Sequence, residues 1–148
     1  MIGLLQRVSS ARVSVAGENV GEIGAGLLVL VCAEPADSIA SAARLLERIL
    51  GYRVFSDGAG KMNRSLKDTG GGLLLVPQFT LGADTRGGTR PSFSSAAPPE
   101  LARGLFEQLV GLAQRAHSPV ACGRFGERMS VSLVNEGPVT FWLQVPPG

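Results

Sequence analysis

The run Leu27-Leu28-Val29-Leu30-Val31-Cys32 decides the class of fold that this sequence can form. An unbroken apolar stretch of this length is typical of a β-strand that is covered on both faces. From Asp37 onward the apolar residues recur with a helical period instead, and Gly51 follows the last of them. This pattern predicts an amphipathic helix that begins after Asp37 or Ser38 and stops at Gly51. We therefore expect a sheet with a helix packed against it.

Shorter patterned segments extend this prediction in both directions. Residues 6–15 and 20–23 alternate between apolar and polar side chains, which predicts an antiparallel meander with residues 27–32. Residues 98–112 have the pattern of a second amphipathic helix. Further strands are predicted at residues 52–55, 73–76, 120–122, 129–134 and 139–145. The fold class is therefore α+β, with a largely antiparallel curled sheet or a barrel-like pair of sheets packed with two amphipathic helices.

Length and composition limit the possible classes of protein. The chain has 148 residues, of which 45% are hydrophobic. This is the size of one globular domain, so we expect a single domain over residues 1–148. The apolar runs are shorter than the ~18 residues that span a bilayer, and the N-terminal sequence lacks the features of a signal peptide. The sequence therefore predicts a cytoplasmic protein with no membrane contact.

Charged residues give an ambiguous indication of a nucleic-acid partner. The 14 Lys and Arg residues against 12 Asp and Glu residues leave a net charge of only +2. Five cations nevertheless fall within a segment rich in glycine and serine: Lys61, Arg64, Lys67, Arg86 and Arg90. A loop surface that presents them to phosphates and an ordinary solvated loop are equally compatible with this pattern.

Cysteine and histidine are too sparse to predict a metal centre. Cys32 and Cys122 lie far apart, match no metal-ligand spacing and sit in apolar surroundings, so we expect two reduced, partly buried thiols. His117 is the only histidine and follows a helical pattern, which favours a place at the end of a helix. We predict neither a metal nor a cofactor, and no local motif supports a Ser-His-Asp mechanism.

The stretch Pro77-Gln78-Phe79-Thr80-Leu81 places polar groups at the end of an apolar run. Pro77 has no N–H to donate, so we expect the Pro77-Gln78 step at a sheet edge or a bulge. The N–H groups of Phe79 and Thr80 would then be free to point at a ligand, as groups that stabilise an oxyanion must. Thr80 is a weak candidate for a nucleophile, because no base lies nearby in the sequence and a β-branched residue in a strand needs no catalytic explanation.

The stretch Asn135-Glu136-Gly137-Pro138-Val139-Thr140 interrupts a second pair of apolar runs. A cis peptide bond costs far less before proline than elsewhere, and Gly137 has no Cβ to keep a ligand away from the main chain. Main-chain groups alone could therefore line a pocket here. The alternative is an ordinary turn between two strands, which the spacing favours when it is taken by itself.

Together these motifs resemble the D-aminoacyl-tRNA deacylase family. The similarity runs from Met1 to about Val145 and rests on several motifs in the family's order. They are Gln6-Arg7-Val8, Tyr52-Arg53-Val54-Phe55, Gly60-Lys61-Met62-Asn63, Gln78-Phe79-Thr80-Leu81, Arg90-Pro91-Ser92-Phe93 and Asn135-x-Gly137-Pro138-Val139-Thr140.

The resemblance implies a homodimeric enzyme that cleaves the ester between a D-amino acid, or glycine, and the 3′-terminal adenosine of tRNA. A cis Gly137-Pro138 bond would enter the pocket of the other subunit, where main-chain carbonyls bind the α-amino group and exclude an L side chain. Gln78, Phe79 and Thr80 would form the catalytic segment, assisted by the ribose 2′-OH. The residues implied to contact the substrate, or to hold the loop that does, are Arg7, Pro77, Asn135, Gly137, Pro138, Val139 and Thr140.

Pro77 departs from the pattern of most family members, which carry Ser at this position. A related animal branch that removes L-alanine from a threonine tRNA also carries Pro there. Arg7 and the stretch from Asn135 to Thr140 resemble the D-specific group, so we expect D-specific hydrolysis. The alternatives are the L-alanyl-tRNA(Thr) type of editing and a non-catalytic nucleic-acid-binding module that uses the basic segment.

Overall fold

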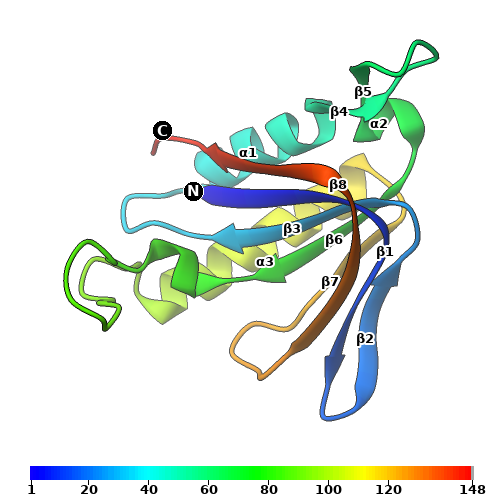
Figure 1. Ribbon diagram of the computed structural model, residues 1–148. Helices are drawn as coiled ribbons and strands as arrows, with labels where there is room; N and C mark the ends of the chain where they lie inside the picture. The colour runs from blue at the N-terminus through cyan, green and yellow to red at the C-terminus, as the bar shows by residue number, and fades with distance from the viewer. Residues whose placement is uncertain (148) are drawn as a thin grey trace.

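Figure 1 shows a computed structural model that describes residues 1–147. The strands are β1 (Ile2–Val15), β2 (Glu18–Ile23), β3 (Gly26–Cys32), β4 (Arg53–Ser56), β5 (Met62–Ser65), β6 (Gly72–Pro77), β7 (Val120–Cys122) and β8 (Ser130–Gln144). The helices are α1 (Ile39–Gly51), α2 (Leu66–Thr69), the 3₁₀ helix η1 (Phe79–Gly82) and α3 (Pro99–Ala116).

The long strand β1 organises the main sheet. Its N-terminal half pairs antiparallel with β3 and its C-terminal half with β2, while β8 pairs antiparallel with β1 along nearly its whole length. The sheet continues from β3 through parallel pairs to β6 and then to β7. The β4–β5 hairpin forms a separate small sheet.

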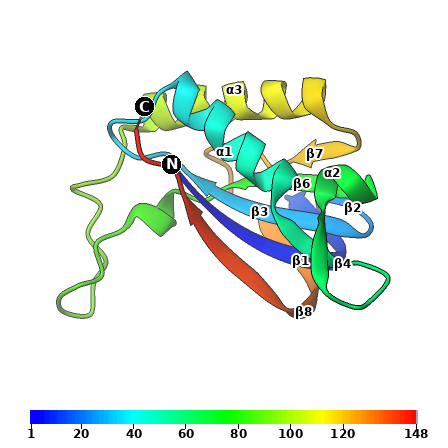
Figure 2. The same cartoon turned by 90° about the horizontal axis from the view of Figure 1, so that it is seen from above.

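The apolar run in β3 divides its side chains between two cores. Leu27 and Val29 pack in the larger core with residues of α1 and α3. Figure 2 shows both helices from above, on one face of the sheet. Leu28 lies between them in the sequence and packs in the smaller core, inside the curl of the sheet. Successive side chains of a strand point to opposite faces, so a strand between two cores must be apolar throughout. The prediction of a strand covered on both faces is confirmed.

The curled sheet is nearly closed where β2 approaches β7. A Cβ placed on Gly21 of β2 would lie only 2.8 Å from the carbonyl oxygen of Cys122 on β7. The missing side chain therefore lets the two edges come together. The α+β class, the barrel-like sheet and the two principal helices are confirmed. No helix within residues 1–147 is long and apolar enough to cross a membrane.

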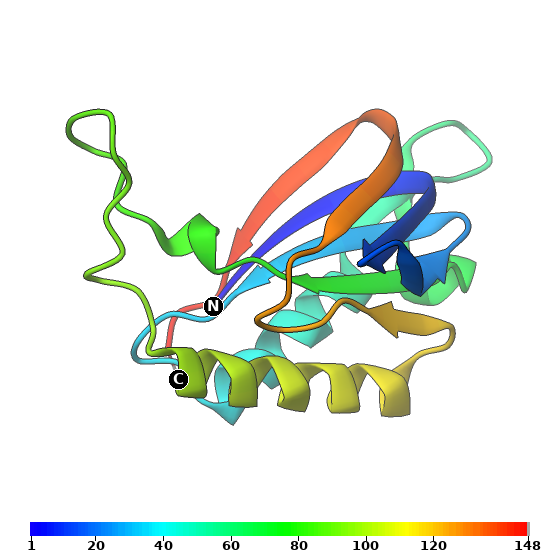
Figure 3. The ribbon, with the colours of Figure 1, turned by 90° about the horizontal axis from the view of Figure 1, so that it is seen from below.

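Three details of the topology differ from the sequence predictions. The first three strands do not form a meander, because β1 lies between β2 and β3. Residues 129–134 and 139–145 belong largely to one strand, β8, whose pairing with β1 is interrupted by irregularities. The polar strand β5 and the short helices α2 and η1 were not predicted. A loop at residues 83–98 connects η1 to α3 and extends away from the sheet in Figure 3.

Candidate functional site

The first motif lies at the end of β6, an interior strand that is buried along its whole length. Pro77 is its last residue and pairs with Val31 of β3, and the N–H of Gln78 donates to the Val31 carbonyl at 2.7 Å. The expected sheet edge is therefore wrong. The pairing of β6 with β7 has already ended at Leu75, so no strand on that side needs the N–H that Pro77 lacks.

The chain turns into η1 directly after Gln78. The first N–H groups of a helix have no acceptor within it, and no hydrogen bond within residues 1–147 uses the N–H of Phe79 or Thr80. Thr80 thus lies in a 3₁₀ helix and not in a strand, which corrects the sequence interpretation. The side-chain nitrogen of Gln78 donates to the Thr80 hydroxyl oxygen. An amide nitrogen cannot take up a proton from this hydroxyl, so this contact does not activate Thr80 as a nucleophile.

A cavity of about 510 Å³ opens beside this segment. Its lining includes residues 76–79, the start of α3 and residues 125–131. Pockets of this size with mainly apolar walls and a few polar groups are typical of small-molecule sites. The sequence prediction included Pro77, Gln78 and Phe79 but missed Phe125, Arg128 and the remainder of the opposite wall. That wall comes from a distant part of the chain and carries no local motif.

The second motif forms an exposed bulge in β8. Two side chains hold it against β1 and β4. Arg7 donates from Nε to the Glu136 carbonyl at 2.9 Å and from Nη1 to the Val54 carbonyl at 2.7 Å. The side-chain nitrogen of Asn135 donates to the carbonyls of Arg7 and Val139, both at 3.1 Å.

Gly137 has a local reason to be glycine. The Gly137–Pro138 peptide bond is cis. A Cβ placed on Gly137 would overlap the side-chain oxygen of Asn135 and the backbone nitrogen of Val139. Val139 is buried, whereas Thr140 is exposed and its hydroxyl accepts a hydrogen bond from Gln6 at 3.3 Å. The bulge thus presents main chain outward and leaves no space for a side chain at its tip.

One chain does not bring the two motifs together. The bulge lies beside Arg7 of β1. In the register of the sheet Arg7 pairs with Leu27 of β3, and Leu27 pairs with Leu73 of β6. Pro77 lies four positions further along β6, which corresponds to ~13 Å at ~3.3 Å per residue. Three strand-to-strand steps separate β8 from β6 and add roughly 14 Å measured along the curved sheet. Figures 1 and 3 agree in placing the bend of β8 away from η1.

The single histidine and the two cysteines have structural contacts. His117 caps α3, and its Nε2 donates to the Gly71 carbonyl at 2.6 Å. Cys32 and Cys122 are both free thiols, as the sequence predicts, and burial raises the pKa of each. They therefore remain protonated at neutral pH. Within residues 1–147, no three His, Cys, Asp or Glu side chains gather in a way that could hold a metal ion.

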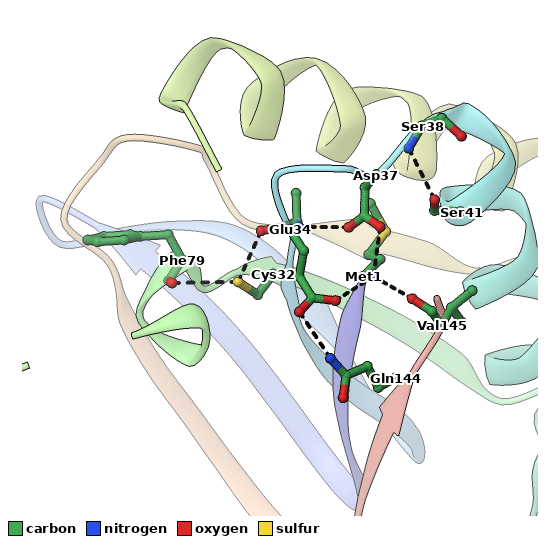
Figure 4. Close-up of polar contacts among 10 residues, drawn as sticks. Met1, Cys32, Glu34, Asp37, Ser38, Ser41, Phe79, Gln144 and Val145 are labelled. Carbon is green, nitrogen blue, oxygen red and sulfur yellow. Dashed lines mark hydrogen bonds and ion pairs between the residues drawn. The ribbon is translucent and has the colours of Figure 1, made fainter. Parts of the chain in front are cut away.

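Cys32 also contacts the segment of residues 78–80, close to an ion cluster at the N-terminus (Figure 4). Its thiol is shared between the carbonyls of Ala33 at 3.4 Å and Phe79 at 3.5 Å. Nearby, the amino group of Met1 lies 2.9 Å from the carboxylate of Asp37 and 3.0 Å from that of Glu34. Removing one member of a buried ion pair is strongly destabilising. The cluster therefore fixes the end of β3 on which Gln78 is anchored.

The predicted basic segment separates into two regions. Lys61, Arg64 and Lys67 lie on or next to the β4–β5 hairpin, at the same end of the molecule as the β8 bulge. Arg86 belongs to the loop of residues 83–98 and forms an ion pair with Asp84 at 2.8 Å. The five cations therefore do not form one continuous surface.

Comparison with known proteins shows the family of the chain. A family model described as D-Tyr-tRNA(Tyr) deacylase matches residues 4–144. A D-aminoacyl-tRNA deacylase of Thioalkalivibrio sulfidiphilus (strain HL-EbGR7) is 67% identical over 99% of both chains. One from Methylibium petroleiphilum (strain ATCC BAA-1232 / LMG 22953 / PM1) is 64% identical over 98% of this chain and 95% of its own. The solved structure of a c-Myc DNA unwinding element binding protein is 35% identical, with a TM-score of 0.93 over 99% of both chains. The chain described here belongs to the D-Tyr-tRNA(Tyr) deacylase family.

Proposed function

We propose that this protein hydrolyses the ester bond of D-aminoacyl-tRNA and that main-chain groups at Gly137 and Pro138 test the configuration of the amino acid. The chain is a D-aminoacyl-tRNA deacylase by close homology, because relatives of that name are 61% to 67% identical over nearly its full length. The observation that supports the proposed chemistry is the pair of N–H groups of Phe79 and Thr80, which make no hydrogen bond within residues 1–147 and follow directly on Gln78 in the wall of a cavity. We place this activity in the cytoplasm, where aminoacyl-tRNA is used.

The N–H groups of Phe79 and Thr80 suit the hydrolysis of an activated ester. Water adds to the ester carbonyl, and the developing oxyanion accepts hydrogen bonds from these N–H groups. The bond between the carbonyl carbon and the ribose 3′-oxygen then breaks. The proton released by the attacking water ends on that leaving oxygen. The neighbouring ribose 2′-OH is held next to both atoms and substitutes for a protein base. This role of the 2′-OH also ties the reaction to RNA.

Selection by main chain follows from the range of substrates that a chiral editor must accept. An enzyme that accepts many D side chains cannot depend on contacts with the side chain, so it must test the arrangement of groups around Cα. The bulge at residues 135–139 is held by Arg7 and Asn135 and has no room for a side chain at Gly137. Such a fixed, unsubstituted main chain is suited to bind the α-amino group and to exclude an L side chain.

A homodimer would bring the two motifs together. Two copies related by a two-fold axis can place the bulge of one subunit beside residues 78–80 of the other. An apolar strip on the sheet face opposite the helices gives such a partner a surface to cover. Trp142 of β8 pairs with Leu4 of β1, which pairs with Leu30 of β3. Trp142 is 50% exposed, and Phe79 is 56% exposed. Exposed apolar surface of this kind is typical of an interface.

The test is a comparison of D-tyrosyl-tRNA with L-tyrosyl-tRNA, with L-alanyl-tRNA(Thr) as a third substrate because of Pro77. We expect the D-ester to be cleaved at least about 100-fold faster than either L-ester. Equal rates on the D- and L-tyrosyl esters would refute selection at the α-carbon, and preferential release of L-alanine would support the other editing branch. Salt-dependent binding of uncharged nucleic acid without any ester cleavage would support the non-catalytic alternative.

A further inference from the structure

The β4–β5 hairpin carries exposed positive charge that no nearby carboxylate pairs. Residues 53–68 contain Arg53, Lys61, Arg64 and Lys67 against only Asp57 and Asp68, a net charge of +2 that equals the charge of the whole chain. These four cations are exposed. Within residues 1–147 none of them forms an ion pair, whereas Arg44, Arg86 and Arg124 each do.

Both carboxylates of this region are occupied by the hairpin's own structure. Asp57 accepts hydrogen bonds from the side chain of Asn63 at 2.8 Å and from the N–H groups of Ala59 and Lys61 at 2.8 and 3.0 Å. Asp68 accepts from the N–H of Ser65 at 2.9 Å. The two acids therefore shape the turn and the short helix α2 and form no ion pair with the cations. The Arg64 guanidinium donates one hydrogen bond to the Asp68 carbonyl at 3.2 Å and is otherwise exposed, like the Lys61 side chain.

The hairpin is also fixed beside the bulge that is proposed to contact the amino acid. The guanidinium of Arg7 binds the carbonyl of Val54 in β4 and the carbonyl of Glu136 in the bulge. Figures 1, 2 and 3 all place the hairpin next to the bend of β8. The turn of the hairpin lies a few residues beyond Val54, which is roughly 10–20 Å of strand. Successive phosphates of a nucleic-acid strand are only a few ångströms apart, ~3.4 Å per strand in duplex DNA, so a tRNA whose amino acid reaches the bulge has several phosphates within this span.

We propose that the β4–β5 hairpin is the surface that binds the sugar-phosphate backbone of the substrate tRNA near its aminoacylated end, with Arg53, Lys61 and Arg64 as the contacts. This assignment rests on the proposed function, since it takes the bulge as the place of the amino acid. Contacts to phosphate supply affinity and register without reading sequence. An editing enzyme that must accept many tRNAs needs this kind of contact.

The experiment compares Lys61→Gln and the double variant Lys61→Gln/Arg64→Gln with a matched control, Arg44→Gln/Arg115→Gln. The control removes the same charge from exposed positions on α1 and α3. The Lys61 side chain makes no hydrogen bond or ion pair within residues 1–147, so its variant tests the proposal without disturbing the fold. Each protein is given D-tyrosyl-tRNA and 3′-O-(D-tyrosyl)adenosine, and its binding of uncharged tRNA is measured over a range of salt.

We expect kcat/KM on D-tyrosyl-tRNA to fall about 5-fold for Lys61→Gln and about 25-fold for the double variant at ~0.1 M salt. Each phosphate contact contributes ~0.7 to the slope of log K against log[salt], which corresponds to a factor of about 5 in affinity per contact at this salt concentration. The loss should appear in KM and in tRNA affinity, with kcat and the rate on D-tyrosyladenosine unchanged. Hairpin variants that bind tRNA as the control does would overturn the proposal. A wild-type chain that binds tRNA through these residues but cleaves no D-ester would refute the proposed function and keep the hairpin assignment.

Discussion

The substitution Phe79→Pro should lower kcat on D-tyrosyl-tRNA by about 100- to 1,000-fold, which is the usual cost of losing one oxyanion donor. Proline removes the N–H of residue 79 and leaves its carbonyl in place. Proline is least disruptive at the first residue of a helix, which Phe79 is in η1, and Gln78 before it has a non-helical backbone (φ −142°, ψ 75°). Single-turnover kinetics measure this effect on the chemical step directly.

The matched control for this variant is Phe79→Ala. Alanine keeps the N–H but removes the ring, whose centroid lies 5.3 Å from that of Phe93. This ring is more than half exposed, so its loss should leave the folded state and the donor in place. We expect kcat of Phe79→Ala to stay within about 10-fold of the wild type. If both variants lose activity equally, the ring and not the N–H is the important group.

Gly137→Ala should lower kcat/KM on D-tyrosyl-tRNA by about 100-fold, because a shift of ~1 Å in a positioning group can cost that much. The physical reason differs from the one predicted from the sequence. The sequence indicates that Gly137 lets a ligand approach the main chain because it has no Cβ, whereas the structure shows that a new Cβ would first overlap Asn135 and Val139 within the bulge. In the Gly137→Ala variant the bulge must therefore shift to make room for the Cβ, and its main chain no longer lies where it binds the substrate.

The control for this substitution is Gly24→Ala. A Cβ at Gly24 meets no atom within 4 Å, and Gly24 is exposed like Gly137. Its kinetics and melting temperature should match those of the wild type. Thermal unfolding of Gly137→Ala separates a displaced bulge from a destabilised fold. Unchanged kinetics for Gly137→Ala would mean that the bulge does not approach the substrate.

Local sequence patterns predicted those parts of the fold whose side chains face a core. The run at residues 27–32 indicated a strand with two covered faces because both of its faces are in fact buried. The helix α1 was predicted to begin after Asp37 or Ser38, and Ser38 is its N-cap, with a capping box to Ser41. The strand β5 was missed because Met62, Asn63 and Arg64 are all exposed, so no alternation of apolar side chains marks it.

The arrangement of the site depends on strand register, which the sequence does not contain. Arg7 and Glu136 are 129 residues apart and meet only because β1 pairs antiparallel with β8. The parallel pairing of β3 with β6 then sets the distance between the bulge and Pro77. The sequence identified residues of both motifs, but only the structure shows that they lie apart on the curled sheet of one chain. The division of the site between two subunits is implied by the family resemblance and stays a prediction.

A mixture of the two inactive variants tests this shared site most directly. In a dimer of a Gly137→Ala chain and a Phe79→Pro chain, one site receives the intact bulge of one subunit and the intact residues 78–80 of the other. Random mixing makes half of the dimers mixed, and each has one intact site of two, so about a quarter of the wild-type D-tyrosyl-tRNA deacylase activity should return. If the mixture stays as inactive as either variant alone, with dimer exchange verified, the site is not shared between subunits.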